Sequence, residues 1–319
     1  MTHMTPMTRT TWREALNSGL GKSLGVQLVG RESLAQLRAQ AEAAQEAQRK
    51  AQRKAQRRAK RSGQAKDVAA DGAKVGAKDG PKTANRRKFP TDVGKEFPEI
   101  WNLVRHRTMT GREKGFYLHQ AVRYITAHQI PGAIVECGVW RGGSMLNVAH
   151  TLGRLGVTDR ELFLFDTFSG MSEPTERDVH LGRRAAAATI LERQSRDSRT
   201  WAMASLDDVR DGFTSVDYPP ERIHFVQGKV EDTIPEGAPE EIAILRLDTD
   251  WYESTRHELT HLYPRLVPGG VLIIDDYGTW KGSKDATDEF LAETGEPLLF
   301  VRTGRGRAAV KPGLSSRVD

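Results

Sequence analysis

The sequence predicts an α/β fold: a mostly parallel, seven-stranded sheet with helices on both faces. Short apolar runs alternate with helical patterns along the second and third thirds of the chain, as in sheets whose parallel strands are joined by helices. Two of the runs, IAILRLD and GVLIIDD, are almost continuously apolar, which is typical of strands buried on both faces. The last two, PLLFV and RAAV, are joined by TGRGR, which is short enough for an antiparallel hairpin that adds an edge strand.

The expected elements follow one another in a regular order. A helix over 112–128 leads through Pro131 and Gly132 into the first strand, AIVECG. Strands ELFLFD, RIHFVQG, IAILRLD and GVLIIDD come next, before the terminal hairpin. The intervening helices are expected to begin at Ser144 and to occupy parts of 200–212, 253–266 and 284–294.

Charge divides the chain into two parts. Residues 1–90 contain 20 Lys and Arg and 7 Asp and Glu, whereas the remainder contains 28 and 35. We therefore assign 1–88 to a basic extension and 89–319 to the folded domain. The isoelectric point of about 9.4 belongs to the extension, and the domain itself is mildly acidic.

The extension combines a helix-forming repeat with a linker. From Ala47 a four-residue unit recurs (AQRK, AQRK, AQRR, AKRS), and its only apolar stripe is alanine. Residues 62–85 are rich in Gly, Ala and Lys, which predicts a disordered linker. Eight basic residues and no acidic one lie within 49–61. This run is either a solvated arm or a binding site for nucleic acid or another anionic polymer.

Other features of the sequence limit the cellular setting. Cys137 is the only cysteine, which excludes an intrachain disulfide and fits a reducing, cytoplasmic compartment. The N-terminus lacks the apolar core of a secretory signal, and no apolar run of 18 residues predicts a membrane span. We therefore expect a cytoplasmic protein without membrane insertion, and the sequence leaves a homo-oligomer open.

Carboxylates end two neighbouring strands of the predicted sheet. Asp248 and Asp250 close IAILRLD and its continuation, and Asp275 and Asp276 close GVLIIDD. Open α/β sheets bind ligands at the edge where the carboxyl ends of their strands meet. Carboxylates so close together repel one another unless a cation lies between them, and hard oxygen ligands suit Mg²⁺. The alternative is a set of helix caps and turn formers.

A glycine-rich turn follows the first strand in VECGVWRGGSM. Gly138 and Gly142 allow a tight turn and a close approach of the backbone, and Ser144 is expected to cap the next helix. Neither the dinucleotide fingerprint nor a Walker lysine is present. Glu136, inside the strand, suits a ligand with cationic or hydroxyl groups; the alternative is a structural glutamate beside ordinary turn glycines.

The next two strands end in residues that suit a nucleoside. Asp166 closes the second strand, where an acid commonly binds a ribose diol, although aspartate also caps helices. Gly228 and Asp232 follow the third strand, where an adenine edge is expected, although Asp232 could instead cap a turn. Trp140, Trp251, Tyr252 and Trp280 either frame an aglycone near this site or pack in the core.

Taken in order, VECGVWRGGS, FDTFSGM, FVQGKVEDTIP, LRLDTDWYEST and PGGVLIIDDY resemble the macrocin O-methyltransferase (TylF) family, over roughly 95–305. The resemblance implies a Rossmann-like class I methyltransferase fold. It also implies transfer of a methyl group from S-adenosylmethionine to a sugar-like or vicinal-diol hydroxyl, with Mg²⁺ as the second cofactor. The basic extension is a departure for which the resemblance offers no role.

The resemblance also implies a role for each motif. The metal ligands would be Asp248, Asp275 and Asp276, and the general base would be Asp250. Glu136 and the backbone near Gly138 would hold the methionine part of the cofactor, Asp166 its ribose, and 228–232 its adenine, beneath a lid at Met109 and Thr110. The implied cofactor-binding residues are Met109, Glu136, Gly138, Gly142, Ser144, Asp166, Gly228 and Asp232.

This chemistry is reasonable for a sugar hydroxyl, which is almost wholly protonated at neutral pH. A Mg²⁺ that contacts two vicinal hydroxyls lowers the pKa of the reacting one, and a nearby carboxylate then takes its proton. Residues two apart on a strand face the same side, so we expect Asp248 to hold the metal and Asp250 to face the substrate. The alternatives are a catechol-type acceptor, a nucleic-acid-associated protein guided by the basic arm, and a domain that binds the cofactor without catalysis.

Overall fold

The computed structural model describes residues 89–196, 198–296 and 298–313. The basic extension, with its repeat and linker, lies outside the described residues, so the domain boundary and the role of 49–61 stay predictions. Within the described ranges, no helix is long and apolar enough to cross a membrane. The cytoplasmic location and the homo-oligomer also stay predictions.

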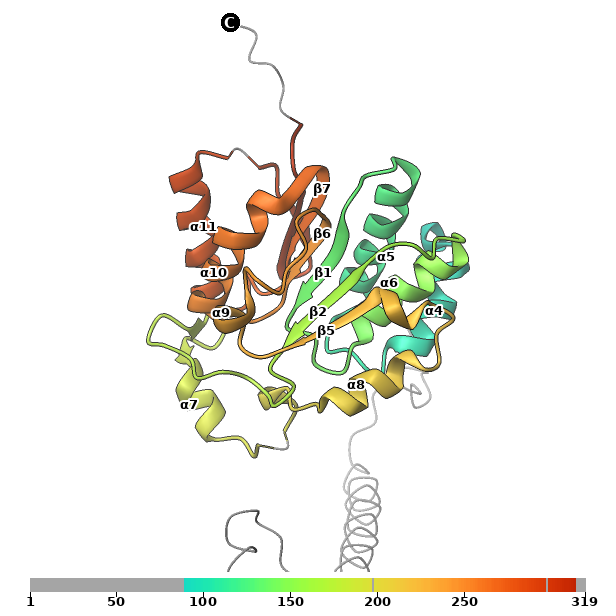
Figure 1. Cartoon of the computed structure of the whole chain (residues 1–319). Helices are drawn as coiled ribbons and strands as arrows, with labels where there is room; N and C mark the ends of the chain where they lie inside the picture. Colours follow the sequence, from blue (N-terminus) through green and yellow to red (C-terminus); the bar gives the residue numbers. More distant parts are fainter. Residues whose placement is uncertain (1–88, 197, 297, 314–319) are drawn as a thin grey trace, which may run out of the picture. The chain divides into compact units, whose positions relative to one another are not determined.

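A seven-stranded sheet forms the centre of the domain, in the order β5-β2-β1-β6-β7-β9-β8 (Figure 1). β5, β2, β1, β6 and β7 are parallel, and β9 is antiparallel to both of its neighbours. The α/β class, the mostly parallel sheet and the C-terminal hairpin are therefore confirmed. The strands are β1 (Ala133–Cys137), β2 (Leu162–Asp166), β5 (Ile223–Gln227), β6 (Ile242–Leu247), β7 (Leu266–Ile274), β8 (Val301–Thr303) and β9 (Gly306–Val310).

The hairpin differs from the expectation in the order of its strands. The antiparallel strand β9 lies inside the sheet, between β7 and β8, so it is not the edge strand. Ala308 and Ala309 of β9 are buried, whereas Val301 of β8 is 52% exposed. The more buried strand therefore takes the inner place. β8 also begins at Val301, later than the PLLFV run suggested, and Leu299 before it is exposed.

Helices cover both faces of the sheet. α4, α5 and α6 lie on one face and α9, α10 and α11 on the other (Figure 1). Successive β7 residues enter opposite core layers, Val271 and Ile273 in one and Leu272 and Ile274 in the other. The α-helices are α4 (Glu96–Val104), α5 (Arg112–Ala127), α6 (Gly143–Arg154), α7 (Ala187–Glu192), α8 (Leu206–Phe213), α9 (Val230–Thr233), α10 (Tyr252–Leu262) and α11 (Lys281–Thr294). The 3-10 helices are η2 (Thr91–Val93), η3 (Arg199–Trp201), η4 (Pro220–Arg222) and η5 (Tyr263–Arg265).

Two helix ends differ from those expected. Gly142, in a left-handed conformation with φ 77°, is the N-cap of α6, so Ser144 lies inside the helix and does not cap it. The helix expected over 253–266 ends at Leu262. Pro264, which cannot donate a helical hydrogen bond, lies in the 3-10 turn that follows, and β7 begins at once after that turn.

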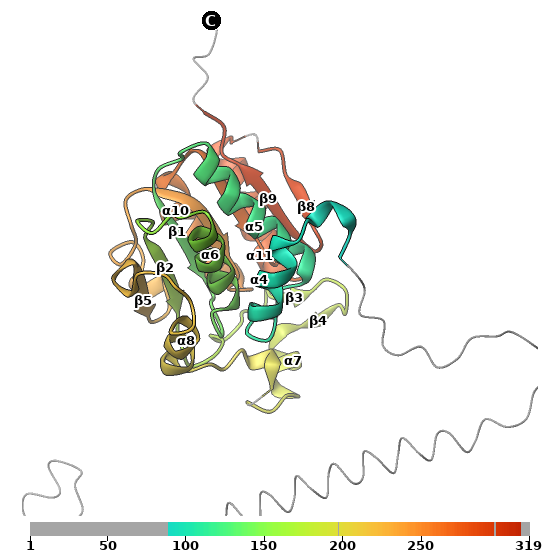
Figure 2. The ribbon, with the colours of Figure 1, turned by 90° about the vertical axis from the view of Figure 1, so that its right-hand side faces the viewer.

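The long segment between β2 and α8 carries a two-stranded sheet, β3 (Val179–His180) with β4 (Ala185–Ala186), and the short helix α7. These elements lie together at one end of the domain (Figure 2). Asp178, fully buried, anchors the segment: its carboxylate accepts the N–H of Tyr252 at 2.8 Å, at the start of α10. A Cβ at Gly282 would lie 1.9 Å from that carboxylate, so the anchor needs glycine on α11.

Candidate functional site

A cavity of about 390 Å³ lies at the carboxyl ends of the parallel strands. Its wall includes the turns after β1, β2, β5, β6 and β7 and part of the β2–α8 segment. Of the residues predicted to be catalytic, cofactor-binding or metal-binding, eight line this cavity: Met109, Gly138, Asp166, Gly228, Asp248, Asp250, Asp275 and Asp276. Four others lie behind the wall or beside it: Glu136, Gly142, Ser144 and Asp232.

The turn after β1 is held in place by β2 and β6. Asp166 accepts the backbone N–H groups of Val139 at 2.7 Å and Trp140 at 2.9 Å, and its other oxygen accepts that of Phe168 at 2.8 Å. A Cβ at Gly138 would lie 2.2 Å from the carbonyl oxygen of Asp248, so only glycine lets the turn pass this close. Asp166 therefore stabilises the turn through its carboxylate. The hydroxyls of a ribose would have to bind the same carboxylate as these backbone N–H groups.

The third strand's turn contributes fewer of the expected residues. Gly228 lines the cavity with φ 145°, and its N–H donates to the backbone carbonyl of Asp166 at 3.0 Å. Asp232 lies within α9, outside the cavity wall, and Glu231 one residue earlier lines the cavity instead. The helical turn of α9 directs successive side chains to different sides, which the sequence did not reveal.

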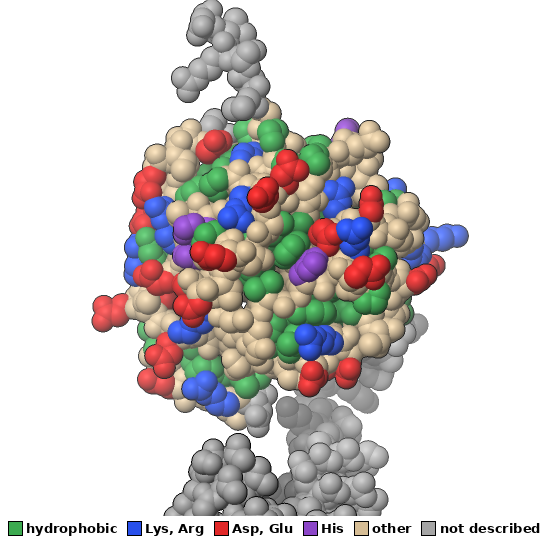
Figure 3. Space-filling view, viewed as in Figure 1, with side chains coloured by type: hydrophobic (Ala, Val, Ile, Leu, Met, Phe, Trp, Pro, Cys, Tyr) green, Lys and Arg blue, Asp and Glu red, His purple; other side chains and the backbone are tan. Residues whose placement is uncertain are grey.

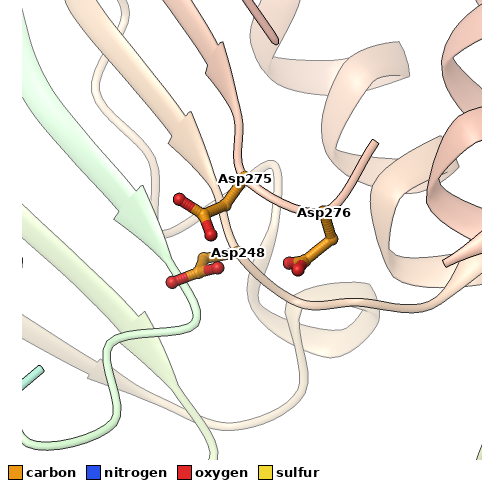
Figure 4. Close-up of side chains that lie close together, drawn as sticks. All are labelled: Asp248, Asp275 and Asp276. Atoms are coloured by element: carbon orange, nitrogen blue, oxygen red, sulfur yellow. The ribbon is translucent and has the colours of Figure 1, made fainter. Parts of the chain in front are cut away.

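Three carboxylates come together where β6 and β7 end (Figure 4). Asp248, Asp275 and Asp276 each offer an oxygen within 4.8 Å of the others. The hydrogen bonds between the parallel strands continue past the strand ends. The N–H of Asp275 donates to the backbone carbonyl of Leu247, and the N–H of Asp248 donates to that of Cys137. The backbone register therefore brings the predicted metal ligands into one cluster; whether they bind a metal stays a prediction.

Arg246 is a residue of this site that the sequence reasoning missed. Its side chain, 3% exposed, extends from β6 into the cluster. The guanidinium forms ion pairs with Glu136, with Asp248 at 2.7 Å and with Asp275 at 2.6 Å, and it donates to the hydroxyl of Thr110 at 2.8 Å. An arginine in the otherwise apolar run IAILRLD was the available signal, because a buried charge needs partners.

Glu136 belongs to this ion-pair network. It is almost fully buried in β1, and one of its oxygens has no hydrogen-bond partner among the described residues. Burial raises its pKa to about 7, opposed by Arg246 and by the Ser144 hydroxyl. Glu136 therefore contributes a buried carboxyl group to the network, and its contact with the cofactor stays a prediction.

The acidic cluster holds more carboxyl groups than cations. Among the described residues, Arg246 and Lys114 are the cationic partners of its carboxylates. Burial raises the pKa values of Asp248 and Asp276 well above their usual range. Burial would also raise the pKa of Asp275, but the two cations hold it below its usual value.

The donor set of the cluster fits a divalent cation. One oxygen of Asp276 is buried and has no hydrogen-bond partner among the described residues. Three carboxylates whose oxygens lie close together, one oxygen being unsatisfied, are hard ligands of the kind that Mg²⁺ prefers.

Asp250 lies in the cavity wall, but not for the reason expected. β6 ends at Leu247, so the alternation of a strand does not relate Asp250 to Asp248. Asp250 instead has a left-handed backbone with φ 69°, and its carboxylate lies beside the side chains of Asp276 and Trp280, which favour its ionised form. Burial raises its pKa to about 7, which is suitable for accepting a proton near neutrality.

The aromatic side chains divide between the cavity and the surrounding structure. Trp140, Trp251 and Trp280 line the cavity. Trp251 and Trp280 are also largely buried against each other, with ring centroids 5.0 Å apart. Tyr252 is not in the cavity wall, because its ring lies under Arg177 and its hydroxyl donates to Glu289.

In the absence of divalent cations, the stability of the domain is expected to fall as the pH rises from about 5 to 8. The folded-state pKa values of Glu136 and Asp250 are about 7, above their ordinary values, so their contribution is complete at low pH and is lost as the pH passes 7. Asp275, whose pKa is lowered, contributes in the opposite direction only at more acidic pH. Thermal unfolding with EDTA should show a decrease in Tm of several degrees, and Mg²⁺ should offset it. A Tm that is constant over this range would contradict the expectation.

Comparison with known proteins gives consistent matches. A sequence model of the macrocin O-methyltransferase (TylF) family matches residues 30–299. Demethyldecarbamoylnovobiocin O-methyltransferase of Streptomyces niveus is 36% identical over 193 residues, which are 60% of this chain and 70% of that enzyme. The 8-demethyl-8-(2,3-dimethoxy-alpha-L-rhamnosyl)-tetracenomycin-C 4'-O-methyltransferase of Streptomyces olivaceus is 34% identical over 206 residues, 65% of this chain and 74% of that enzyme. The solved structure of the O-methyltransferase NovP has a TM-score of 0.57 and 32% identity, and covers 65% of this chain and 83% of that chain.

Proposed function

The chain belongs to the macrocin O-methyltransferase family and is an S-adenosylmethionine-dependent O-methyltransferase, and we propose that it methylates a sugar-like or vicinal-diol hydroxyl with the help of Mg²⁺. The observation that carries this proposal is the cluster of Asp248, Asp275 and Asp276 beside Asp250 in one cavity. The tetracenomycin relative is named for 4'-O-methylation of a compound with a rhamnosyl group, which supports a sugar acceptor.

Residues of the cavity wall would hold the cofactor. The cavity has a volume of about 390 Å³, which is within the range of small-molecule sites. The backbone near Gly138 would contact the methionine part, Asp166 the ribose, and the turn at Gly228 the adenine. Met109, 49% exposed in the segment between α4 and α5, would cover the sulfonium.

In the proposed reaction, Asp250 takes the proton of the acceptor hydroxyl as its oxygen forms a bond to the methyl carbon and the carbon–sulfur bond breaks. S-adenosylmethionine supplies a methyl group on a good leaving group, and the protein therefore mainly supplies alignment. Asp248, Asp275 and Asp276 would hold Mg²⁺, which would supply a Lewis acid that lowers the pKa of the acceptor hydroxyl.

The face shown in Figure 3 does not support the alternative of a nucleic-acid substrate. Basic and acidic side chains are interspersed on the face in Figure 3, which presents no continuous basic surface there. A polyanion needs such a surface for affinity. The basic run 49–61 lies outside the described residues and stays a candidate for an electrostatic arm.

The proposal is tested by incubating the full chain with S-adenosylmethionine and a panel of glycosides that carry vicinal diols, with catechols and RNA as competing acceptors. We expect methylation of a sugar hydroxyl, detected by mass spectrometry, that depends on Mg²⁺ and is lost with EDTA. Calorimetry should first detect micromolar binding of S-adenosylhomocysteine. An unchanged rate in EDTA would reject the metal, and methylation of RNA or catechols alone would reject the sugar-like acceptor.

A further inference from the structure

Lys114 is a cation of the acidic cluster that comes from a different layer of the fold. It lies in the first turn of α5, immediately after the segment with Met109 and Thr110 that borders the cavity. Its ammonium donates to a carboxylate oxygen of Asp275 at 2.5 Å and to the backbone carbonyl of the same residue at 3.0 Å. The ammonium therefore occupies one of the two carboxylate oxygens through which a metal at this cluster could bind Asp275.

Both oxygens of Asp275 already have a cationic partner. Oδ1 accepts from Arg246 at 2.6 Å, and Oδ2 accepts from Lys114. A divalent cation that binds Asp275 through Oδ2 must therefore compete with the ammonium. By contrast, one oxygen of Asp276 is buried without a hydrogen-bond partner among the described residues and is ready to accept a ligand.

The two cations differ in their freedom to move. Arg246 extends from a central strand, is 3% exposed and is held by Glu136, Asp248, Asp275 and Thr110 together. Lys114 is 17% exposed, lines the cavity and has Asp275 as its hydrogen-bond partner. Its four-carbon stem is flexible and its ammonium is strongly hydrated, so its withdrawal into water costs little.

We propose that Lys114 is a displaceable counter-ion of the acidic cluster, which holds Asp275 in the metal-free enzyme and leaves that carboxylate when a divalent cation binds. Arg246 stays in place and neutralises the same side of the cluster in both states. The inference rests on the proposed metal site and adds to it a residue that sets the affinity for the ion.

Calorimetric titration of MgCl₂ into the metal-free full chain tests this directly. Lys114→Met should bind Mg²⁺ more tightly than the wild type, on the order of tenfold, because a positive charge next to the ion is removed. Lys114→Arg keeps the charge and should not bind more tightly. Lys284→Met is the matched control, since Lys284 pairs with Asp288 on α11, away from the cavity, and its affinity should equal that of the wild type.

Thermal unfolding provides a second readout that a merely structural lysine would not give. Lys114→Met should lower Tm in EDTA, where the cluster loses a counter-ion, and lower it less in saturating Mg²⁺. By linkage, the difference must match the gain in affinity. An equal loss of Tm in both conditions would overturn the inference.

The failure of the inference is distinguishable from the failure of the metal site. Mg²⁺ binding by the wild type that is not tightened in Lys114→Met would overturn the inference alone. The absence of Mg²⁺ binding in both proteins would overturn the proposed metal site as well. Binding by the variant but not by the wild type would overturn the inference, because Lys114 would then exclude the ion instead of being displaced by it.

Discussion

Asp250→Asn is expected to lower kcat by about three orders of magnitude, within the range for loss of a general base. The amide has almost the same shape as the carboxylate and can still bond to Asp276, but it cannot accept the proton of the acceptor hydroxyl. Binding of S-adenosylhomocysteine and Mg²⁺ should therefore change by less than about threefold. Single-turnover kinetics and calorimetry measure the two effects separately.

The matched control is Asp288→Asn, which removes an acid that pairs with Lys284 on the exposed side of α11. Its kcat should equal that of the wild type. If Asp250→Asn retained a rate within tenfold of the wild type, the proton acceptor would lie elsewhere in the cavity. If it lost Mg²⁺ binding together with the rate, Asp250 would be a metal ligand instead of a base.

The arrangement of the sheet could be predicted because its signals are local. The apolar runs that became β1, β6 and β7 are recognisable from a few residues each, and strand–helix alternation implies a parallel sheet. The meeting of Asp248 with Asp275 follows from that arrangement, because both stand where neighbouring parallel strands end.

The partners of these carboxylates could not be predicted, because their contacts are not local. Arg246 pairs with Glu136 across 110 positions of the chain, and Lys114 reaches Asp275 across 161. No spacing rule connects such residues without the three-dimensional fold. The sequence therefore indicates that the carboxylates need a cation, but not that Arg246 and Lys114 supply part of the positive charge.

Backbone conformation accounts for the other differences. Asp250 has a left-handed conformation, which aspartate tolerates but which the neighbouring residues do not predict. Gly142 takes the N-cap position that Ser144 was expected to hold, because a left-handed turn precedes α6. Aspartate and serine both occur in several structural roles, and the local φ that decides between these roles cannot be read from the sequence.

Arg246→Met is expected to cause the largest loss of stability of the changes considered, roughly 3–5 kcal/mol in the free energy of unfolding. The substitution removes the shared partner of Glu136, Asp248 and Asp275, while Glu136 and Asp275 stay buried and Asp248 stays largely buried. Chemical denaturation of the metal-free protein measures the loss. Arg154→Met is the control: its partner Glu99 is 62% exposed, and a surface pair of this kind contributes at most about 1 kcal/mol.

The cause of this loss can be separated from loss of packing by the response to metal. If Arg246 acts through its charge, Mg²⁺ should stabilise Arg246→Met more than the wild type, because the ion then supplies the missing positive charge to Asp248 and Asp275. Adding Glu136→Gln should also recover part of the stability, since it removes one of the unpaired carboxylates. Equal stabilisation of variant and wild type by Mg²⁺, with no gain from Glu136→Gln, would mean that the arginine acts through packing. A loss no greater than that of Arg154→Met would mean that the carboxylates are held by protons and not by Arg246.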